Sequence, residues 1–130
     1  IDNSLDNFGF SFNFTLMDSE MDIPGREDKV QISRQADKLY NFALYYDNGD
    51  FAARVAVNHK GEYIEDHGSN STLDTYYGDY TSVDATASYY INDNAMVYLE
   101  LNNLTDEPLQ YFTGSEQRPN QIEYYGIYFL

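Results

Sequence analysis

Two stretches of the chain decide its fold. Residues 39–63 read LYNFALYYDNGDFAARVAVNHKGEY, and residues 80–103 read YTSVDATASYYINDNAMVYLELNN. Each contains two runs of alternating large apolar and small or polar residues. The runs are joined by short turns, Asp47-Asn48-Gly49-Asp50 and Asn92-Asp93-Asn94. Because successive side chains of a β-strand point to opposite faces, each stretch is predicted to form a β-hairpin.

The two faces of the first hairpin differ in character. One face takes the large apolar side chains: Tyr40, Phe42, Leu44, Tyr46, Phe51, Ala53, Val55 and Val57. In the second run, the other face takes small or polar side chains: Ala52, Arg54, Ala56, Asn58 and Lys60. A soluble sandwich would fit this pattern. A transmembrane β-barrel fits it better, because the polar face carries charge in mid-strand.

Composition excludes several classes of function. The 130 residues suffice for one domain, and the absence of Cys excludes a disulfide framework or a thiolate metal site. The net charge of −15 argues against a nucleic-acid partner, whose binding depends on Lys and Arg. Fourteen Tyr and eight Phe suit strands and membrane-interface belts.

No run is apolar enough for a transmembrane helix. The first ten residues do not resemble a signal peptide. The chain does not begin with Met, so we expect it to be cut from something longer.

The remaining segments alternate between strands and long loops. Residues 8–17 and 121–130 are predicted to be strands, and residues 18–38, 65–79 and 104–120 are predicted to be long loops. Short and long connections therefore alternate strictly. Outer-membrane barrels sort their connections in this way, with short periplasmic turns and long external loops. A membrane-crossing strand needs about 9–11 residues, which most of the runs reach.

Several of these motifs resemble those of one protein family. Residues 98–107 (YLELNNLTDE), the pair Tyr111-Phe112 and the pair Tyr125-Gly126 in a closing strand resemble the C-terminal end of a TonB-dependent outer-membrane receptor. Residues 51–63 (FAARVAVNHKGEY) resemble the Ala-Arg-Val strand that precedes this end. The resemblance covers residues 8–130, and its best marker is the Asn-Leu-Thr-Asp element at residues 103–106.

The resemblance implies a fold, a function and a location. Family members are 22-stranded barrels, filled by a plug domain, in the outer membrane of Gram-negative bacteria. They import iron–siderophore complexes, haem, cobalamin or oligosaccharides, with energy from the TonB–ExbB–ExbD complex. Residues 1–130 are therefore expected to be all-β, an antiparallel meander supplying about the last six strands without the plug. The implied partners are a small-molecule nutrient, outer-membrane lipid and, through the missing plug, TonB–ExbB–ExbD. The chain departs from the family in lacking the plug and in stopping at Leu130, before the usual terminal aromatic residue.

Two groups of residues are candidates for function. Arg54, Lys60 and Asp84 are predicted to face the barrel lumen and contact the plug. Glu100 shares its face with Met96 and Tyr98, so the alternation assigns it to the lumen less cleanly. Tyr76, Tyr77, Tyr111, Phe112 and Arg118 lie in predicted long loops. Exposed aromatic side chains and arginine on loops suit either a ligand-binding mouth or an aromatic girdle at the membrane edge.

The sequence offers no convincing metal or catalytic site. His59, Glu62, Glu65 and His67 are close in sequence, but in a strand His59 and Glu62 would point to opposite faces. The acidic segment at residues 18–28 lacks the EF-hand pattern, so we predict a solvated loop. No nucleophile–base pair or phosphate loop is evident. We therefore predict no enzyme activity and no cofactor.

Two other architectures remain open. A soluble all-β module, such as a carbohydrate-binding or adhesin sandwich, would bring its apolar faces together. A small closed outer-membrane barrel would need about eight strands, whereas the sequence predicts six.

Overall fold

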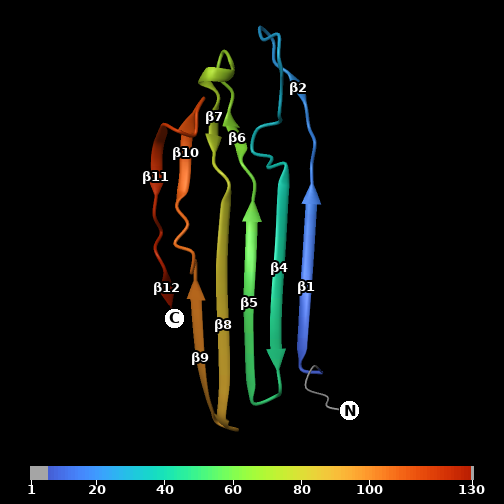
Figure 1. Ribbon diagram of the computed structural model, residues 1–130, viewed down its shortest axis with the longest axis vertical. Coiled ribbons are helices and arrows are strands. Elements are labelled where there is room, and N and C mark those ends of the chain that lie inside the picture. The colour runs from blue at the N-terminus through green and yellow to red at the C-terminus, as the bar shows by residue number, and fades with distance from the viewer. Residues whose placement is uncertain (1–5, 130) are drawn as a thin grey trace.

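Antiparallel strands make up most of the computed structural model, which describes residues 6–129 (Figure 1). The larger sheet has six strands. Their order across the sheet is β1 (Phe8–Leu16), β4 (Lys38–Asp47), β5 (Phe51–Lys60), β8 (Tyr80–Asn92), β9 (Ala95–Asn102) and β12 (Tyr128–Phe129). The prediction of an all-β antiparallel meander is therefore confirmed.

A second sheet continues the first beyond its upper end in Figure 1. Its order is β11 (Pro119–Glu123), β10 (Leu109–Thr113), β7 (Thr75–Tyr77) and β6 (Tyr63–Asp66). Above the sheets lie a ribbon of β2 (Met21–Asp22) with β3 (Lys29–Val30) and a 3-10 turn, η1 (Ser71–Leu73). Within residues 6–129, no helix is long and apolar enough to span a membrane.

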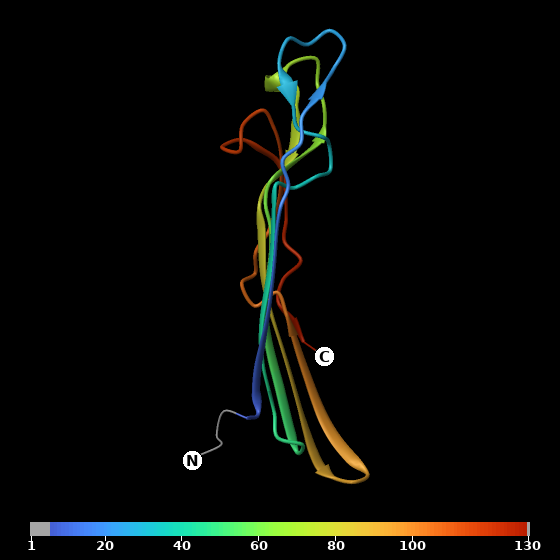
Figure 2. The same cartoon turned by 90° about the vertical axis from the view of Figure 1, so that its right-hand side faces the viewer.

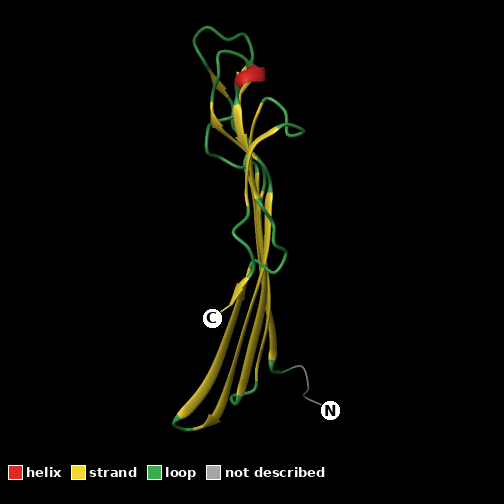
Figure 3. Ribbon diagram, turned by 90° about the vertical axis from the view of Figure 1, so that its left-hand side faces the viewer, coloured by secondary structure: helices red, strands yellow, loops and turns green. Residues whose placement is uncertain are grey.

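Short and long connections lie at opposite ends of the molecule (Figure 3). Turns of two or three residues join β4 to β5 and β8 to β9 at the lower end. In the first, Gly49 has a positive φ of 92°, and its N–H donates to Asp47 Oδ1 at 2.8 Å. The connections that follow β1, β6 and β10 reach the other end. The predicted alternation of short turns and long connections is therefore confirmed.

The segments predicted as loops contain more strand than expected. Residues 18–38 hold the β2–β3 ribbon and the first residue of β4, residues 65–79 include the end of β6 and all of β7, and residues 104–120 include β10. The predicted strand 121–130 is divided between β11 and β12, and Leu130 lies outside the described residues. Strands of two to five residues are too short for alternation to show in the sequence.

The six-stranded sheet is a single layer, curved and twisted along its length (Figure 2). Cross-strand pairing places one apolar row, Phe12, Phe42, Val57 and Val83, on one face. That face is open: Phe10 is 72% exposed and Val55 is 46% exposed. A sandwich would bury such side chains against a second layer, and the described residues provide none.

Buried apolar side chains are few and mostly small. They are Val30, Ala36, Ala43, Ala56, Ile64 and Phe112. The six-stranded sheet is also open, because its edge strands β1 and β12 do not pair with each other. Closure into a barrel is thus not seen in residues 6–129.

The Asn-Leu-Thr-Asp element forms the junction between the two sheets, after β9. Asn103 has a φ of 53° and is 5% exposed. Its N–H donates to Asp84 Oδ1 at 3.0 Å, and its side-chain oxygen accepts from the Glu107 N–H at 3.2 Å. Thr105 Oγ1 donates to the Thr81 carbonyl at 3.0 Å. The hydrogen bonds to Asp84 and Thr81 fix the chain to β8 at the point where it leaves the larger sheet.

Candidate functional site

A row of tyrosines crosses the upper sheet. Tyr63, Tyr77 and Tyr111 are directly paired across β6, β7 and β10, so their side chains share one face. The Tyr63 and Tyr77 rings are 5.4 Å apart and nearly parallel, at 28°. Those of Tyr77 and Tyr111 are 5.3 Å apart and tilted by 59°. We call these three residues the tyrosine row.

Charged and amide groups border both ends of the tyrosine row. At the β6 end, Lys60 Nζ lies 3.7 Å from the centroid of the Tyr63 ring, and Arg34 pairs with Glu65 at 2.9 Å. At the β11 end, Glu123 accepts hydrogen bonds from Gln121 and from the Tyr125 hydroxyl. The row therefore has a cationic end and an anionic end.

The surroundings of Tyr63 and Tyr77 raise the pKa of both phenols. Burial is the main cause of the raised pKa of Tyr77, followed by the neighbouring Tyr63 and the carboxylates of Glu65 and Glu123. Burial also raises the pKa of Tyr63. Both rings are therefore neutral at physiological pH and offer hydroxyl groups as donors.

The opposite face of the same strands has a packing role. Tyr76 stacks on Phe112 at 5.3 Å, and Ile64 is paired with Tyr76. Phe112 is only 3% exposed and Ile64 only 5%. These side chains supply apolar contacts that hold the upper sheet, and Phe112 and Ile64 are buried among them.

The structure places the predicted ligand residues on different faces and in different elements. Tyr76, Tyr77, Tyr111 and Phe112 lie in strands rather than in loops, because β7 and β10 extend into the predicted loop segments. Only Tyr77 and Tyr111 come together on the row. Arg118 lies apart, exposed in the turn before β11, where its N–H donates to the Ser115 carbonyl at 3.1 Å.

The three long connections meet at one buried residue, Asp74. Asp74, 1% exposed, accepts from Arg26 Nη1 at 2.6 Å and from the Gly68 N–H at 2.8 Å. The Gly114 N–H donates to the Asp74 carbonyl at 2.9 Å. Arg26 also pairs with Asp28. We call Arg26, Gly68, Asp74 and Gly114 the loop junction.

The ion pair at the loop junction shifts the pKa of both partners. Burial alone would raise the pKa of Asp74. The hydrogen bonds from Arg26 and Gly68 outweigh it, so that the pKa is lowered. The pKa of Arg26 is raised by its hydrogen bonds to Asp28 and then to Asp74. Both partners therefore remain charged across the physiological range.

The predicted lumen residues do share one face of the larger sheet. Pairing relates Arg54 to Thr86 and then to Glu100, and Lys60 to Tyr80. Asp84 lies on the same face of the sheet, but Asn58 Nδ2 and the Asn103 N–H already donate hydrogen bonds to its two carboxylate oxygens. Its main contacts are therefore internal, and Arg54 is the exposed charge of the group. The contact of these side chains with a plug stays a prediction.

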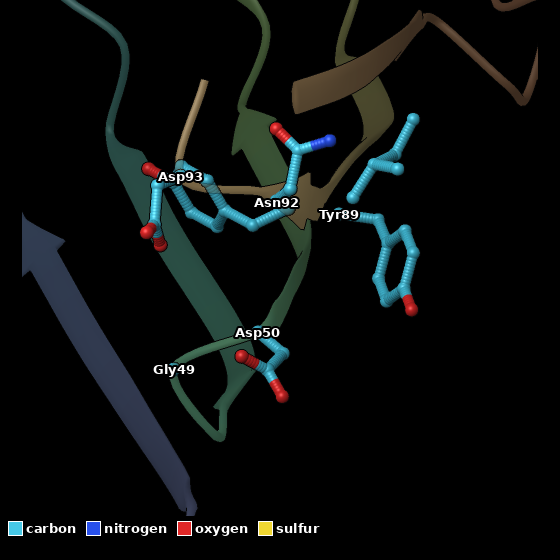
Figure 4. Close-up of a pocket in the computed structure, with 7 residues that line it drawn as sticks. Gly49, Asp50, Tyr89, Asn92 and Asp93 are labelled. Carbon is cyan, nitrogen blue, oxygen red and sulfur yellow. The ribbon is translucent and has the colours of Figure 1, made fainter. Parts of the chain in front are cut away.

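A hollow of about 390 Å³ lies at the lower end, between the two short turns (Figure 4). Its lining comprises Gly49, Asp50, Tyr89, Tyr90, Ile91, Asn92 and Asp93. The side chains labelled in Figure 4 point in different directions and do not converge on a common point. In residues 6–129, no group of three metal-ligating side chains comes together either. The tyrosine row is therefore the stronger candidate site.

Sequence reasoning missed several residues of the row and the loop junction. Tyr63 was expected to close a hairpin, and Glu123 to lie in a continuous final strand. Arg26 lies in the acidic segment predicted to be a solvated loop, and Asp74 lies in a predicted long loop. The sequence carries one usable signal: Tyr63, Tyr77 and Tyr111 each belong to a pair of adjacent apolar or aromatic residues, which favours strand.

Comparison of the sequence with protein-family models, with curated proteins and with solved structures found no match. The geometry of the described residues is therefore what supports a function.

Proposed function

We propose that this chain is part of the wall of an outer-membrane β-barrel receptor of the TonB-dependent type, which takes up a scarce small-molecule nutrient. The observation that carries the proposal is the open apolar face of the six-stranded sheet. Phe10, Phe12 and Leu16 are 72%, 63% and 64% exposed on a regular strand, and no layer of described residues covers them. Leaving such a face in water forgoes about 25 cal/mol for each Å² of apolar surface, whereas a bilayer would cover it.

The dimensions of the strands support the proposal. Strands β1, β4, β5, β8 and β9 have 9, 10, 10, 13 and 8 residues. A strand that crosses a bilayer needs about 9–11 residues. The sorting of short turns to one end and long connections to the other is also typical of outer-membrane barrels.

In this proposal the two sheets have different tasks. The larger sheet supplies membrane wall, with its polar face toward the lumen. The upper sheet and the loop junction project outside and carry the tyrosine row. Nutrient binding at the row would precede passage through the lumen, with energy delivered through a plug and TonB.

Adjacent residues on opposite faces of β5 test the proposal. The chain contains no Cys, so Arg54→Cys and Val55→Cys each provide a unique site for a spin label. The protein would be labelled in membranes of the cells that make it. We expect lipid-soluble oxygen to relax the label at residue 55, and a water-soluble nickel complex to relax the label at residue 54. Equal access of the nickel complex to both labels would refute a lipid-facing sheet.

A further inference from the structure

The Tyr77 and Tyr111 rings form an open aromatic corner. Their centroids are 5.3 Å apart and their planes are tilted by 59°, so the two rings do not stack face to face. The Tyr63 and Tyr77 rings, in contrast, are nearly parallel at 28°. Because β7 lies between β6 and β10, Tyr63 flanks the side of Tyr77 away from Tyr111, and the corner consists of Tyr111 and the side of Tyr77 that faces it. Both residues of the corner are partly exposed. A corner of two rings is the basis of the aromatic cages that bind alkylated ammonium groups.

An uncompensated negative charge lies beside the corner. Glu123 is on β11, on the row's face, two residues from Gln121, which pairs with Tyr111. Its oxygens accept from two neutral donors, Gln121 and the Tyr125 hydroxyl. No lysine or arginine forms an ion pair with Glu123 in the part of the chain that the structure describes. The carboxylate thus offers charge at the corner while each of its oxygens already accepts one hydrogen bond.

The other end of the row already holds a cation. Lys60 Nζ is 3.7 Å from the centroid of the Tyr63 ring, within the range of a cation–π contact. The chain thus places its own ammonium on one tyrosine and leaves the anionic end, with two rings and a carboxylate, without one. The net charge of −15 would further favour the approach of a cation.

We propose that Tyr77, Tyr111 and Glu123 bind the quaternary ammonium group of a small organic molecule. A trimethylammonium group donates no classical hydrogen bond, so it suits rings and a carboxylate that is already hydrogen-bonded. Tyr125, exposed and hydrogen-bonded to Glu123, would border the open side of the corner. The inference rests on the proposed function only in making this molecule the nutrient; the binding itself does not depend on the membrane.

Binding of choline to the full chain in a non-ionic detergent tests the inference. The matched probe is 3,3-dimethylbutan-1-ol, which has the same shape without the charge. We expect saturable calorimetric binding of choline and much weaker binding of the alcohol. Tyr77→Leu and Tyr111→Leu should each lower choline affinity by roughly 2- to 30-fold, the range of one cation–π contact. Glu123→Gln should also weaken it, whereas Glu116→Gln, in the neighbouring exposed turn, should not.

Each outcome of the choline experiments leads to a different conclusion. Equal binding of choline and the alcohol, or choline binding that the ring variants leave unchanged, would overturn the inference. So would the absence of saturable choline binding by a chain whose circular dichroism shows intact β-structure. Saturable binding of a neutral oligosaccharide that Tyr77→Leu abolishes, without choline binding, would assign the row to sugars instead. Because lipid contact is measured separately on β5, failure of the membrane proposal would leave this result intact, and the reverse also holds.

Discussion

At the scale of single residues, a few polar side chains take the place of a large core. Asn103 and Asp74 are nearly fully buried; Asn103 donates a hydrogen bond to Asp84, and Asp74 accepts one from Arg26, both distant in the sequence. Buried polar groups are costly unless paired, so removing one partner penalises the groups left behind. The two junctions between sheets and loops should therefore be sensitive to substitution.

Replacing Asn103 by Ala should destabilise the junction after β9. The φ of 53° suits Asn and Gly better than Ala, and the Glu107 N–H would lose its acceptor. Together these effects should cost about 2–4 kcal/mol. Urea unfolding in detergent measures the change. Asn103→Gly is the matched control, since it keeps the backbone conformation and should cost less; equal costs would show that backbone strain plays no part.

The loop junction should loosen in acid. Because the folded-state pKa of Asp74 is lowered, its contribution to stability is complete above the ordinary value of 3.8 and is lost as pH falls through the folded value. Hydrogen exchange of the Gly68 and Gly114 amides should therefore accelerate below pH 3.8 relative to amides of β5. Asp74→Ala should show the fast exchange at neutral pH. Acid acceleration that persists unchanged in this variant would contradict the assignment to Asp74.

At the scale of elements, the sequence predicted the long strands well and the short ones poorly. Alternation over eight or more residues identified β1 and the two hairpins, β4 with β5 and β8 with β9. The upper strands have only three to five residues, and their pairing depends on distant partners such as β7 with β10. The tyrosine row therefore could not be assembled from the sequence, although two of its three members were singled out as ligand candidates.

The same elements predict that the two faces of the sheet tolerate charge differently. Leu44 lies on the exposed apolar face, and Thr86 lies on the polar face next to Arg54. In lipid vesicles, Leu44→Arg should cost about 2–4 kcal/mol, the penalty for arginine facing the middle of a bilayer. Thr86→Arg should cost clearly less, after allowance for repulsion from Arg54. Denaturant unfolding of the two variants gives the comparison, and equal costs would argue against a lipid-facing side.

At the scale of the whole molecule, the described residues leave the edges and one face of the larger sheet without a partner. The larger sheet has two unpaired edges, β1 and β12, and one open apolar face. Unpaired edge strands with large apolar side chains promote association between chains, and the net charge of −15 opposes it. These two effects should make the association of this chain strongly dependent on salt and on detergent.

Substitutions in edge strand β1 test whether the apolar face or the net charge controls association between chains. Without detergent, we expect the 130-residue chain to self-associate, and more strongly as salt screens its charge. Phe12→Lys places a charge on the apolar face of β1, while Asn13→Lys places the same charge on the polar face one residue away. Both variants change the net charge equally, so any difference between them reports the face. Analytical ultracentrifugation should show weaker association for Phe12→Lys than for Asn13→Lys. If both variants behaved alike, association would follow net charge alone, and the apolar face would not be the surface that requires a cover.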